Sequence, residues 1–285
     1  MTFGQHLNND KVNSNNTNNS NINNLLNEKS CFVIDLDGVV YKGKQLISGA
    51  NEAILKFRHS GKKIVFLTNN SADSVDQVLN KLIHLGVVCD RQEILTAAQA
   101  SASFIAQHQI DRGRGLFIVG TEALKQEVIT QGLSIADPDD CGAVLVGLDP
   151  DFDYTKINLA LRAITRGASL VICNRDANFP VEDGHLKAGC GAMVGAIESA
   201  SGRLADFEVG KPKTIMLDII INKMQIDLNS CLIIGDMLAS DILMANNAKI
   251  PSIWISKTST YSNLSSDYPL PSFCMPSLEA ISKFI

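Results

Sequence analysis

Two aspartates, one residue apart, directly follow a short apolar run in the first fifth of the chain. Asp35 and Asp37 come after Cys31–Ile34, and Gly38 follows them. An unbroken apolar run of this kind predicts a strand buried on both faces of a parallel sheet, and open α/β sheets bind ligands at the carboxyl ends of such strands. Two carboxylates this close repel each other unless a cation or a shared proton relieves the repulsion. An Asp-rich turn has the same composition, so the pair alone leaves both interpretations open.

Three further segments place polar side chains after strand-like runs or in a loop. They are Thr68–Ser71, Lys211 in the sequence VGKPK, and Asp236 together with Asp241. Because parallel strands end at one edge of a sheet, we expect these groups to converge there. Taken singly, a run such as Thr68–Ser71 caps a helix and a lysine is mostly exposed. Their joint occurrence in this order argues against turns alone.

This set of side chains suits the transfer of a phosphoryl group. Carboxylate oxygens are ligands for Mg²⁺, which commonly bridges to phosphate. One aspartate can act as a nucleophile and form an aspartyl-phosphate, while a second protonates the leaving oxygen and later deprotonates water. A lysine and hydroxyl donors neutralise the charge of the group in transfer. The residues therefore predict an enzyme that binds a divalent cation and a small phosphorylated molecule.

The apolar periodicity predicts strands and helices that alternate in two series. The outer series gives strands at 31–34, 63–67, 231–236 and 253–255 and helices at 49–59, 75–85, 97–108, 214–224 and 278–284. The inner series gives strands at 116–119, 143–146 and 170–173 and helices at 122–130, 154–165 and 192–199. Such alternation predicts an α/β fold, with a Rossmann-like three-layer core around a parallel sheet. We expect the core to comprise residues 29–97 and 206–285, and residues 98–205 to form an inserted α/β domain.

The composition excludes several other classes of protein. The chain has 285 residues and a net charge of −5, and it shows no basic cluster of the kind that binds nucleic acid. It has no apolar run of the ~20 residues that a membrane span needs. Its seven cysteines include no C-x-x-C pair, which indicates free thiols in a reducing cytoplasm. Eleven of the first 30 residues are Asn, so we expect residues 1–28 to be a disordered tail.

The motifs resemble those of the haloacid dehalogenase superfamily of phosphohydrolases. They read DLDGV from Asp35, LTNNS from Leu67, VGKPK from Val209 and IIGDMLASD from Ile233. The stretch NRDANFPVEDGHLKAGCGAMVGAIESASG, in the predicted inserted domain, is similar to the NagD-like or 4-nitrophenylphosphatase branch. That branch includes phosphoglycolate and pyridoxal-phosphate phosphatases, and the resemblance extends over residues 31–256.

The resemblance implies a role for each matching residue of the core motifs. Asp35 would be the nucleophile and Asp37 the general acid and base, while Lys211 would stabilise Asp35 and the phosphate. Asp35, the backbone carbonyl of Asp37 and Asp236 would bind Mg²⁺, with Asp241 supporting these ligands from behind. The phosphoryl oxygens would be bound by the residues that follow the second core strand, namely Thr68, Asn69 and Asn70.

The inserted domain would then be the cap of this branch, with a loop that reaches over the leaving group. Its candidate substrate contacts are Asn174, Asp176, Asn178 and Phe179, and such a cap can also pair two subunits. Pyridoxal-phosphate phosphatases tend to have His where Phe179 aligns, and phosphoglycolate phosphatases tend to have Arg at Asn178. Neither marker is present, so we expect a small, polar phosphomonoester as the substrate. Met237 and Ser256 also depart from the residues of many relatives, at positions peripheral to the chemistry.

Three other activities fit parts of the pattern. A dehalogenase of the same superfamily needs the nucleophile but no acid for an alkoxide, so Asp37 argues against it. A catalytically silent binding module would lack at least one core motif residue, and none is missing. A phosphotransferase has the same motifs, although the large cap favours water as the acceptor.

Overall fold

The apolar run Cys31–Ile34 forms β1, an inner strand of a six-stranded sheet in the order β14-β13-β12-β1-β4-β5. The computed structural model describes residues 20–180, 185–257 and 269–285. Every strand pair in this sheet is parallel, and Ile34 pairs with both Ile234 and Phe66. The other strands are β4 (Lys63–Thr68), β5 (Ile94–Thr96), β12 (Cys231–Gly235), β13 (Ser252–Ile255) and β14 (Phe273–Met275).

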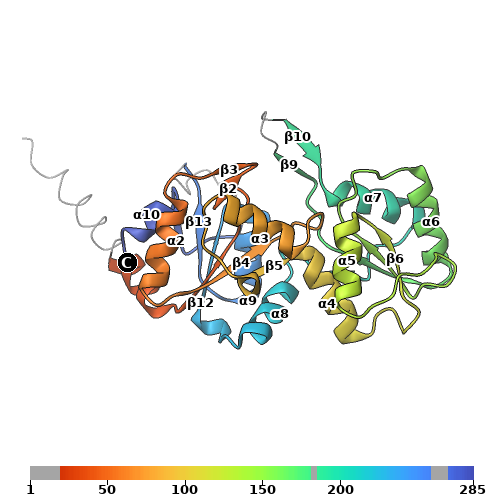
Figure 1. The fold of residues 1–285 in the computed structure, drawn as a ribbon, viewed down its shortest axis with the longest axis horizontal. Helices are drawn as coiled ribbons and strands as arrows, with labels where there is room; N and C mark the ends of the chain where they lie inside the picture. Colours follow the sequence, from red (N-terminus) through yellow and green to blue (C-terminus); the bar gives the residue numbers. More distant parts are fainter. Residues whose placement is uncertain (1–19, 181–184, 258–268) are drawn as a thin grey trace, which may run out of the picture.

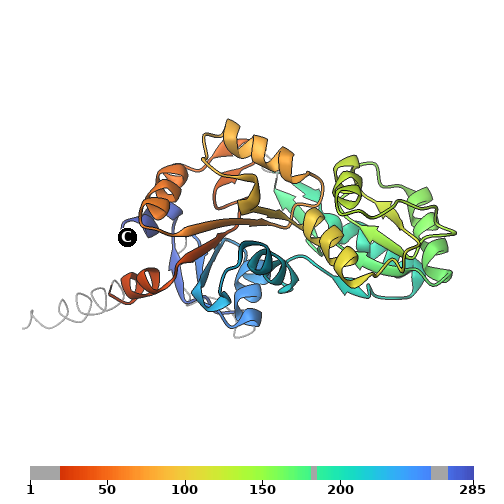
Figure 2. The ribbon, with the colours of Figure 1, turned by 60° about the horizontal axis from the view of Figure 1, so that its bottom comes forward.

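Alternate residues of these strands enter two separate cores, as expected for a sheet covered on both faces. Phe32 and Ile34 pack in one cluster with α2 (Ala50–His59), α3 (Val75–His84) and α10 (Leu278–Ser282). Val33 faces the opposite cluster, with α8 (Ile215–Met224) and α9 (Leu243–Ala248). Figure 2 shows the two groups of helices on either side of the sheet. The predicted three-layer α/β core is thus confirmed.

A second sheet, of four parallel strands in the order β11-β8-β7-β6, lies beside the first (Figure 1). It consists of β6 (Leu116–Val119), β7 (Ala143–Val146), β8 (Ser169–Ile172) and β11 (Phe207–Glu208). One face is covered by α6 (Tyr154–Thr165) and α7 (Cys190–Ser201), the other by α5 (Glu122–Thr130). The predicted inner series therefore folds as its own α/β unit, which we call the cap. Its last strand, β11, lies two residues beyond the boundary that we expected at residue 205.

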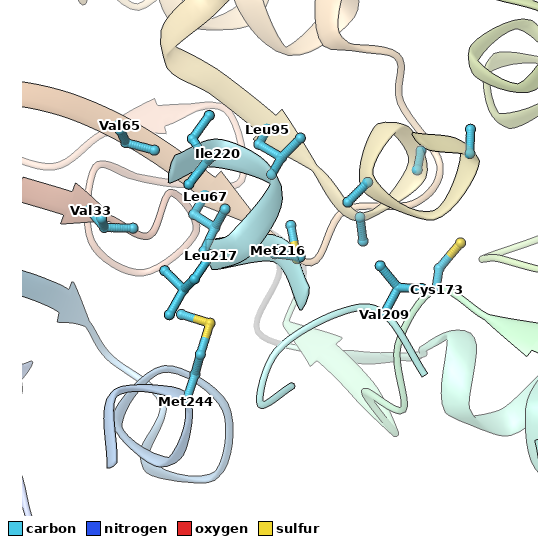
Figure 3. Close-up of a cluster of buried hydrophobic side chains, with 14 of the residues drawn as sticks. Val33, Val65, Leu67, Leu95, Cys173, Val209, Met216, Leu217, Ile220 and Met244 are labelled. Atoms are coloured by element: carbon cyan, nitrogen blue, oxygen red, sulfur yellow. The ribbon is translucent and has the colours of Figure 1, made fainter. Parts of the chain in front are cut away.

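Helix α4 (Ala97–His108) joins the two units without a break in the hydrophobic packing. Its side chains are mostly Ala and Ser, and eight of the twelve are buried, which lets elements of both units approach it closely. The same cluster contains Leu217 of the core and Cys173 and Val209 at the edge of the cap (Figure 3). The cap thus rests on the core through a continuous apolar contact.

Two short hairpins lie on the same side of the molecule, at the top of Figure 1. One is β2 (Tyr41–Lys42) with β3 (Gln45–Leu46), directly after β1. The other is β9 (Asn178–Pro180) with β10 (Leu186–Ala188), which projects from the cap in Figure 1. The cap loop that we expect to reach over the leaving group therefore includes a strand, β9. The hydrogen bonds of the antiparallel pair hold Asn178 and Phe179 in an extended conformation.

The N-terminal prediction was wrong for residues 20–28, which are helical. Ile22 and Leu26 are buried in the core cluster that contains α2 and α10. Lys62 Nζ donates to the carbonyl of Leu26 at 2.5 Å, which ties this segment to the core. The remainder of the predicted tail, residues 1–19, lies outside the described residues. Within the described ranges, none of the helices has the length and apolar character needed to span a bilayer.

Candidate active site

A buried lysine lies between two buried carboxylates at the carboxyl edge of the six-stranded sheet. Lys211 Nζ lies 2.6 Å from Asp35 Oδ1 and 2.7 Å from Asp241 Oδ1. Lys211 is 3% exposed, Asp35 8% and Asp241 1%. Burial lowers the pKa of the Lys211 ammonium, but the two carboxylates outweigh this effect and hold the pKa well above its usual value. The two carboxylates therefore stabilise the charged form of the Lys211 ammonium.

A third carboxylate leaves this group of charges with an excess of negative charge. Asp35, Asp236 and Asp241 each place an oxygen within 4.8 Å of the others. Burial, and then the neighbouring Asp241, raise the pKa of Asp236 to about 7. Burial also raises the pKa of Asp35, and Lys211 opposes that rise. One ammonium does not balance three carboxylates, so the donor set fits a divalent cation with a preference for oxygen ligands.

Asp37 lies on the turn that leads from β1 into β2. The turn is closed by a hydrogen bond of 2.8 Å from Gly38 N to Tyr41 O. Gly38 has a φ of 84°, and a Cβ atom there would collide with the Asp236 carboxylate, so only glycine lets the backbone of this turn approach Asp236. Burial raises the pKa of the Asp37 carboxyl, against the charges of Lys81 and Lys42. A raised pKa favours a carboxylic acid that can donate a proton near neutral pH.

Thr68 and Asn70 occupy the end of β4 and the loop that follows it. The Thr68 side chain is buried, and its Oγ1 accepts from Asn70 N at 3.2 Å. Asn70 Oδ1 accepts from Ala72 N and Asp73 N at 2.8 and 2.9 Å. The Asn70 side chain thus shapes the loop before α3 as an Asx turn, whereas Ser74 caps the helix.

The remaining loop residue, Asn69, contacts the cap. Its Nδ2 donates to both carboxylate oxygens of Asp176, at 3.2 and 3.1 Å. Asn174 Nδ2 donates to Asn69 O at 2.7 Å, and Asn174 Oδ1 accepts from Asp176 N at 3.0 Å. The structure therefore places Asn174 and Asp176 beside the site, with their side chains paired to Asn69 of the core.

All of these residues except Asp241 line one open cleft between the core and the cap. Asn178 and Phe179 line it from the β9–β10 hairpin, and Tyr41 and Lys42 line it from the β2–β3 hairpin. Lys81 of α3 also lines the cleft, with its Nζ 3.6 Å from the centroid of the Tyr41 ring. Sequence reasoning missed Lys81 because a lysine on an amphipathic helix has no local mark of a site residue.

A carboxylate held against a lysine, with two more carboxylates and a hydroxyl at one sheet edge, is an arrangement that suits a hydrolase of the α/β class. Comparison with known families agrees with this geometry. Haloacid dehalogenase-like hydrolases match residues 32–134, and a related HAD-hydrolase-like family matches residues 208–280.

The sugar-phosphatase AraL of Bacillus subtilis is 35% identical over 213 residues, which cover 74% of this chain and 77% of that protein. The chain therefore belongs to the haloacid dehalogenase-like hydrolase family.

Solved structures give the same result over a larger part of the chain. A p-nitrophenyl phosphatase from Archaeoglobus fulgidus has a TM-score of 0.84 and 29% identity, with 90% of this chain and 99% of that one covered. A glycerol phosphate phosphatase from Mycobacterium tuberculosis, in complex with magnesium, has a TM-score of 0.81 and 31% identity, with 91% and 79% covered. These similarities confirm the NagD-like branch, and the protein is a phosphatase of this family.

Proposed function

We propose that the protein is a magnesium-dependent phosphatase that hydrolyses a small phosphomonoester through an aspartyl-phosphate on Asp35. The observation that supports this most directly is the contact of Asp35 Oδ1 with Lys211 Nζ at 2.6 Å in a buried site. It fixes one carboxylate oxygen and leaves the other for attack. The same ammonium would stabilise the charge that develops on the phosphoryl group, and it would need no reorganisation during the reaction.

The proposed reaction has two displacements at phosphorus. Asp35 attacks the phosphorus atom, the bond to the ester oxygen breaks, and Asp37 gives its proton to that oxygen to release an alcohol. Asp37, now a carboxylate, takes a proton from water, whose oxygen attacks the same phosphorus. The bond to Asp35 breaks, inorganic phosphate leaves, and both aspartates return to their initial states. Thr68 and the backbone of its loop would bind the phosphoryl oxygens.

Asp35 and Asp236 would hold the magnesium ion, together with the backbone carbonyl of Asp37, and Asp241 would support them. The ion would neutralise the excess negative charge of the site and the charge of the phosphoryl group. The close approach of the Gly38 backbone to Asp236 supports this ligand set. The magnesium complex of the Mycobacterium tuberculosis relative supports it further.

The β9–β10 hairpin would determine the selectivity for the leaving group of the ester. Asn178 is exposed and Phe179 is half-buried, and both line the cleft. They offer one polar and one apolar contact, which favours a small, polar phosphomonoester. Replacing Asn178 or Phe179 by Ala should change kcat/KM unequally among esters, because selectivity consists of unequal transition-state contacts. It should leave the magnesium requirement unchanged, and an equal change for all esters would contradict this role.

The test of the function is a panel of phosphomonoesters assayed with the purified full chain and magnesium. The panel should include sugar phosphates, phosphoglycolate, nucleotides, pyridoxal phosphate and 4-nitrophenyl phosphate, with a 2-haloacid as the dehalogenase control. We expect release of phosphate from at least one ester, no halide release, and no turnover by Asp35→Asn. Absence of phosphate release from all esters, or release that persists in Asp35→Asn, would refute the proposal. An added alcohol as acceptor would detect phosphotransfer.

Two further expectations stay proposals. We propose a cytoplasmic location because all seven cysteines are free thiols, five of them buried. We also propose that a homodimer would form through the cap, which sedimentation of the purified protein would test.

A further inference from the structure

The side-chain amide of Asn69 forms two hydrogen bonds with the backbone of Lys211. Asn69 Oδ1 accepts from Lys211 N at 2.8 Å, and Asn69 Nδ2 donates to Lys211 O at 3.1 Å. Both backbone groups of the lysine are therefore bound by one planar amide. This fixes the position from which the Lys211 side chain extends to Asp35 and Asp241.

The cap supplies the group that orients this amide. Nδ2 of Asn69 has two N–H donors, and Lys211 O and the Asp176 carboxylate account for both of them. Asp176 lies in the segment that follows β8 of the cap, and its backbone is held by Asn174. A hydrogen bond to a charged carboxylate is stronger than one between neutral groups, so Asp176 also fixes which end of the Asn69 amide faces Lys211 N.

The absence of a side chain at Gly210 lets the segments that contain Cys173, Asn69 and Lys211 pack against one another. Gly210 N donates to Cys173 O at 2.7 Å. A Cβ atom at Gly210 would collide with Cys173 O and lie 2.7 Å from Asn69 Oδ1. The return of the chain from the cap to the core thus passes directly between Cys173 and Asn69, and any larger residue would push Lys211 away.

We infer that Asp176 and Asn69 are positioning residues for the reaction: Asp176 of the cap orients the Asn69 amide, which holds the Lys211 backbone so that Nζ reaches Asp35. The inference rests on the proposed function. It replaces the sequence-based expectation that Asp176 contacts the leaving group. The cap must then be packed against the core for Lys211 to be correctly placed, whichever ester is bound.

The cap holds the same loop at other points that do not involve Lys211. Thr121 Oγ1 donates to Ala72 O at 2.7 Å, and Leu148 N donates to Ser71 Oγ at 2.9 Å. Thr121→Val removes this cap-to-loop hydrogen bond, together with the helix-capping bond from Leu124 N to Thr121 Oγ1, and nearly preserves the side-chain shape. It is therefore a matched control for a general role in anchoring the cap.

The experiment measures kcat and KM of the full chain for three esters with different leaving groups. Variants are Asn69→Ala, Asp176→Ala, Asp176→Asn, the double variant Asn69→Ala/Asp176→Ala, and Thr121→Val. Removing residues that orient a site typically costs about 10–100-fold in activity. We expect such a loss in kcat for Asn69→Ala and Asp176→Ala, by the same factor for every ester. Asp176→Asn, which keeps one acceptor oxygen, should lose less.

Two comparisons separate positioning from a structural role or from substrate contact. Because Asp176 acts through Asn69, the double variant should lose no more activity than Asn69→Ala alone, and Thr121→Val should stay within about threefold of wild type. A loss at Asp176 that differs among the esters would identify a substrate contact and overturn the inference. Unchanged kcat, additive losses, or an equal loss in Thr121→Val would also overturn it. Circular dichroism melting identifies any variant that fails to fold, and Asp176→Asn then decides the result.

The same assays distinguish failure of the inference from failure of the proposed function. Turnover by the wild type, abolished in Asp35→Asn, is measured first. Its absence refutes the function, and the inference with it. Its presence together with unaffected Asn69 and Asp176 variants refutes the inference alone.

Discussion

Replacing Lys211 by Met tests whether this lysine compensates the buried carboxylates of the site. Met has a similar length and no charge, so the substitution removes the two ion pairs of 2.6 and 2.7 Å and little volume. Asp35 and Asp241 would then be left as carboxylates without their cation. We expect the folded protein to be destabilised and phosphatase turnover to be lost.

The expected size follows from the burial of the three groups. Breaking a buried ion pair by removing one partner typically costs about 3–5 kcal/mol of unfolding free energy. For a chain of this size, each kcal/mol corresponds to roughly 2–4 °C in Tm, so the Tm should fall by about 6–20 °C. Lys213→Met is the matched control, because the Lys213 side chain is 53% exposed and its Nζ lies 3.9 Å from Glu208. It should change stability by less than about 1 kcal/mol.

The assay is urea unfolding with excess chelator, at several pH values. Lys211 lowers the pKa of Asp35, so without it the folded protein holds a proton on that carboxyl to higher pH than the unfolded chain does. The variant's stability relative to wild type should therefore fall as the pH rises from about 4 toward 8. Adding Asp241→Asn should restore part of the loss. A loss below about 1 kcal/mol, or no restoration by Asp241→Asn, would refute this account of the site.

Three further predictions address the metal, the acid and the N-terminal helix. Because the pKa of Asp236 is about 7, protons compete with the cation below that pH. Turnover should stop in excess chelator, and Mg²⁺ should raise the Tm more at pH 8 than at pH 5.5; an equal rise would contradict a role for Asp236. Asp37→Asn should slow hydrolysis of alkyl phosphates by about 10²–10⁴-fold and that of 4-nitrophenyl phosphate less, whereas equal slowing would contradict the acid role. Leu26→Ala should destabilise the protein by about 2–5 kcal/mol, measured by urea unfolding, and Glu28→Ala, on the exposed side of the same helix, should not.

The sequence predicted the core of the site because its residues follow strands. Asp35, Thr68 and Asp236 each come directly after a buried apolar run, and parallel strands bring such positions to one edge. Lys211 follows no such run, and only its motif identified it. The pairing of Lys211 with Asp241 was not predictable, because it depends on the five-residue turn over Leu238–Ile242 after β12.

Two features could not be predicted from local patterns. The first is the helix over residues 20–28, where Ile22, Leu25 and Leu26 have helical spacing but the high Asn content suggested disorder. Burial against α2 and α10 supplies the free energy that orders a segment of this composition. The second is the Asn69–Asp176 contact, which depends on how closely the cap seats on the core. A polar residue at a strand end gives no indication of whether a substrate or another part of the chain will bind it.

The measurement that tests the central claim most directly is chemical trapping of the phosphorylated enzyme. The full chain, with magnesium and an ester that it hydrolyses, is quenched with borohydride, which reduces an acyl phosphate to an alcohol. Peptide mass spectrometry then locates the product. Asp37→Asn is measured in parallel with 4-nitrophenyl phosphate, whose leaving group needs little protonation, so that slow attack by water should increase the trapped fraction. We predict homoserine at position 35 alone, dependent on substrate and absent in Asp35→Asn. Turnover with no modification at position 35, or modification of another aspartate, would contradict the account.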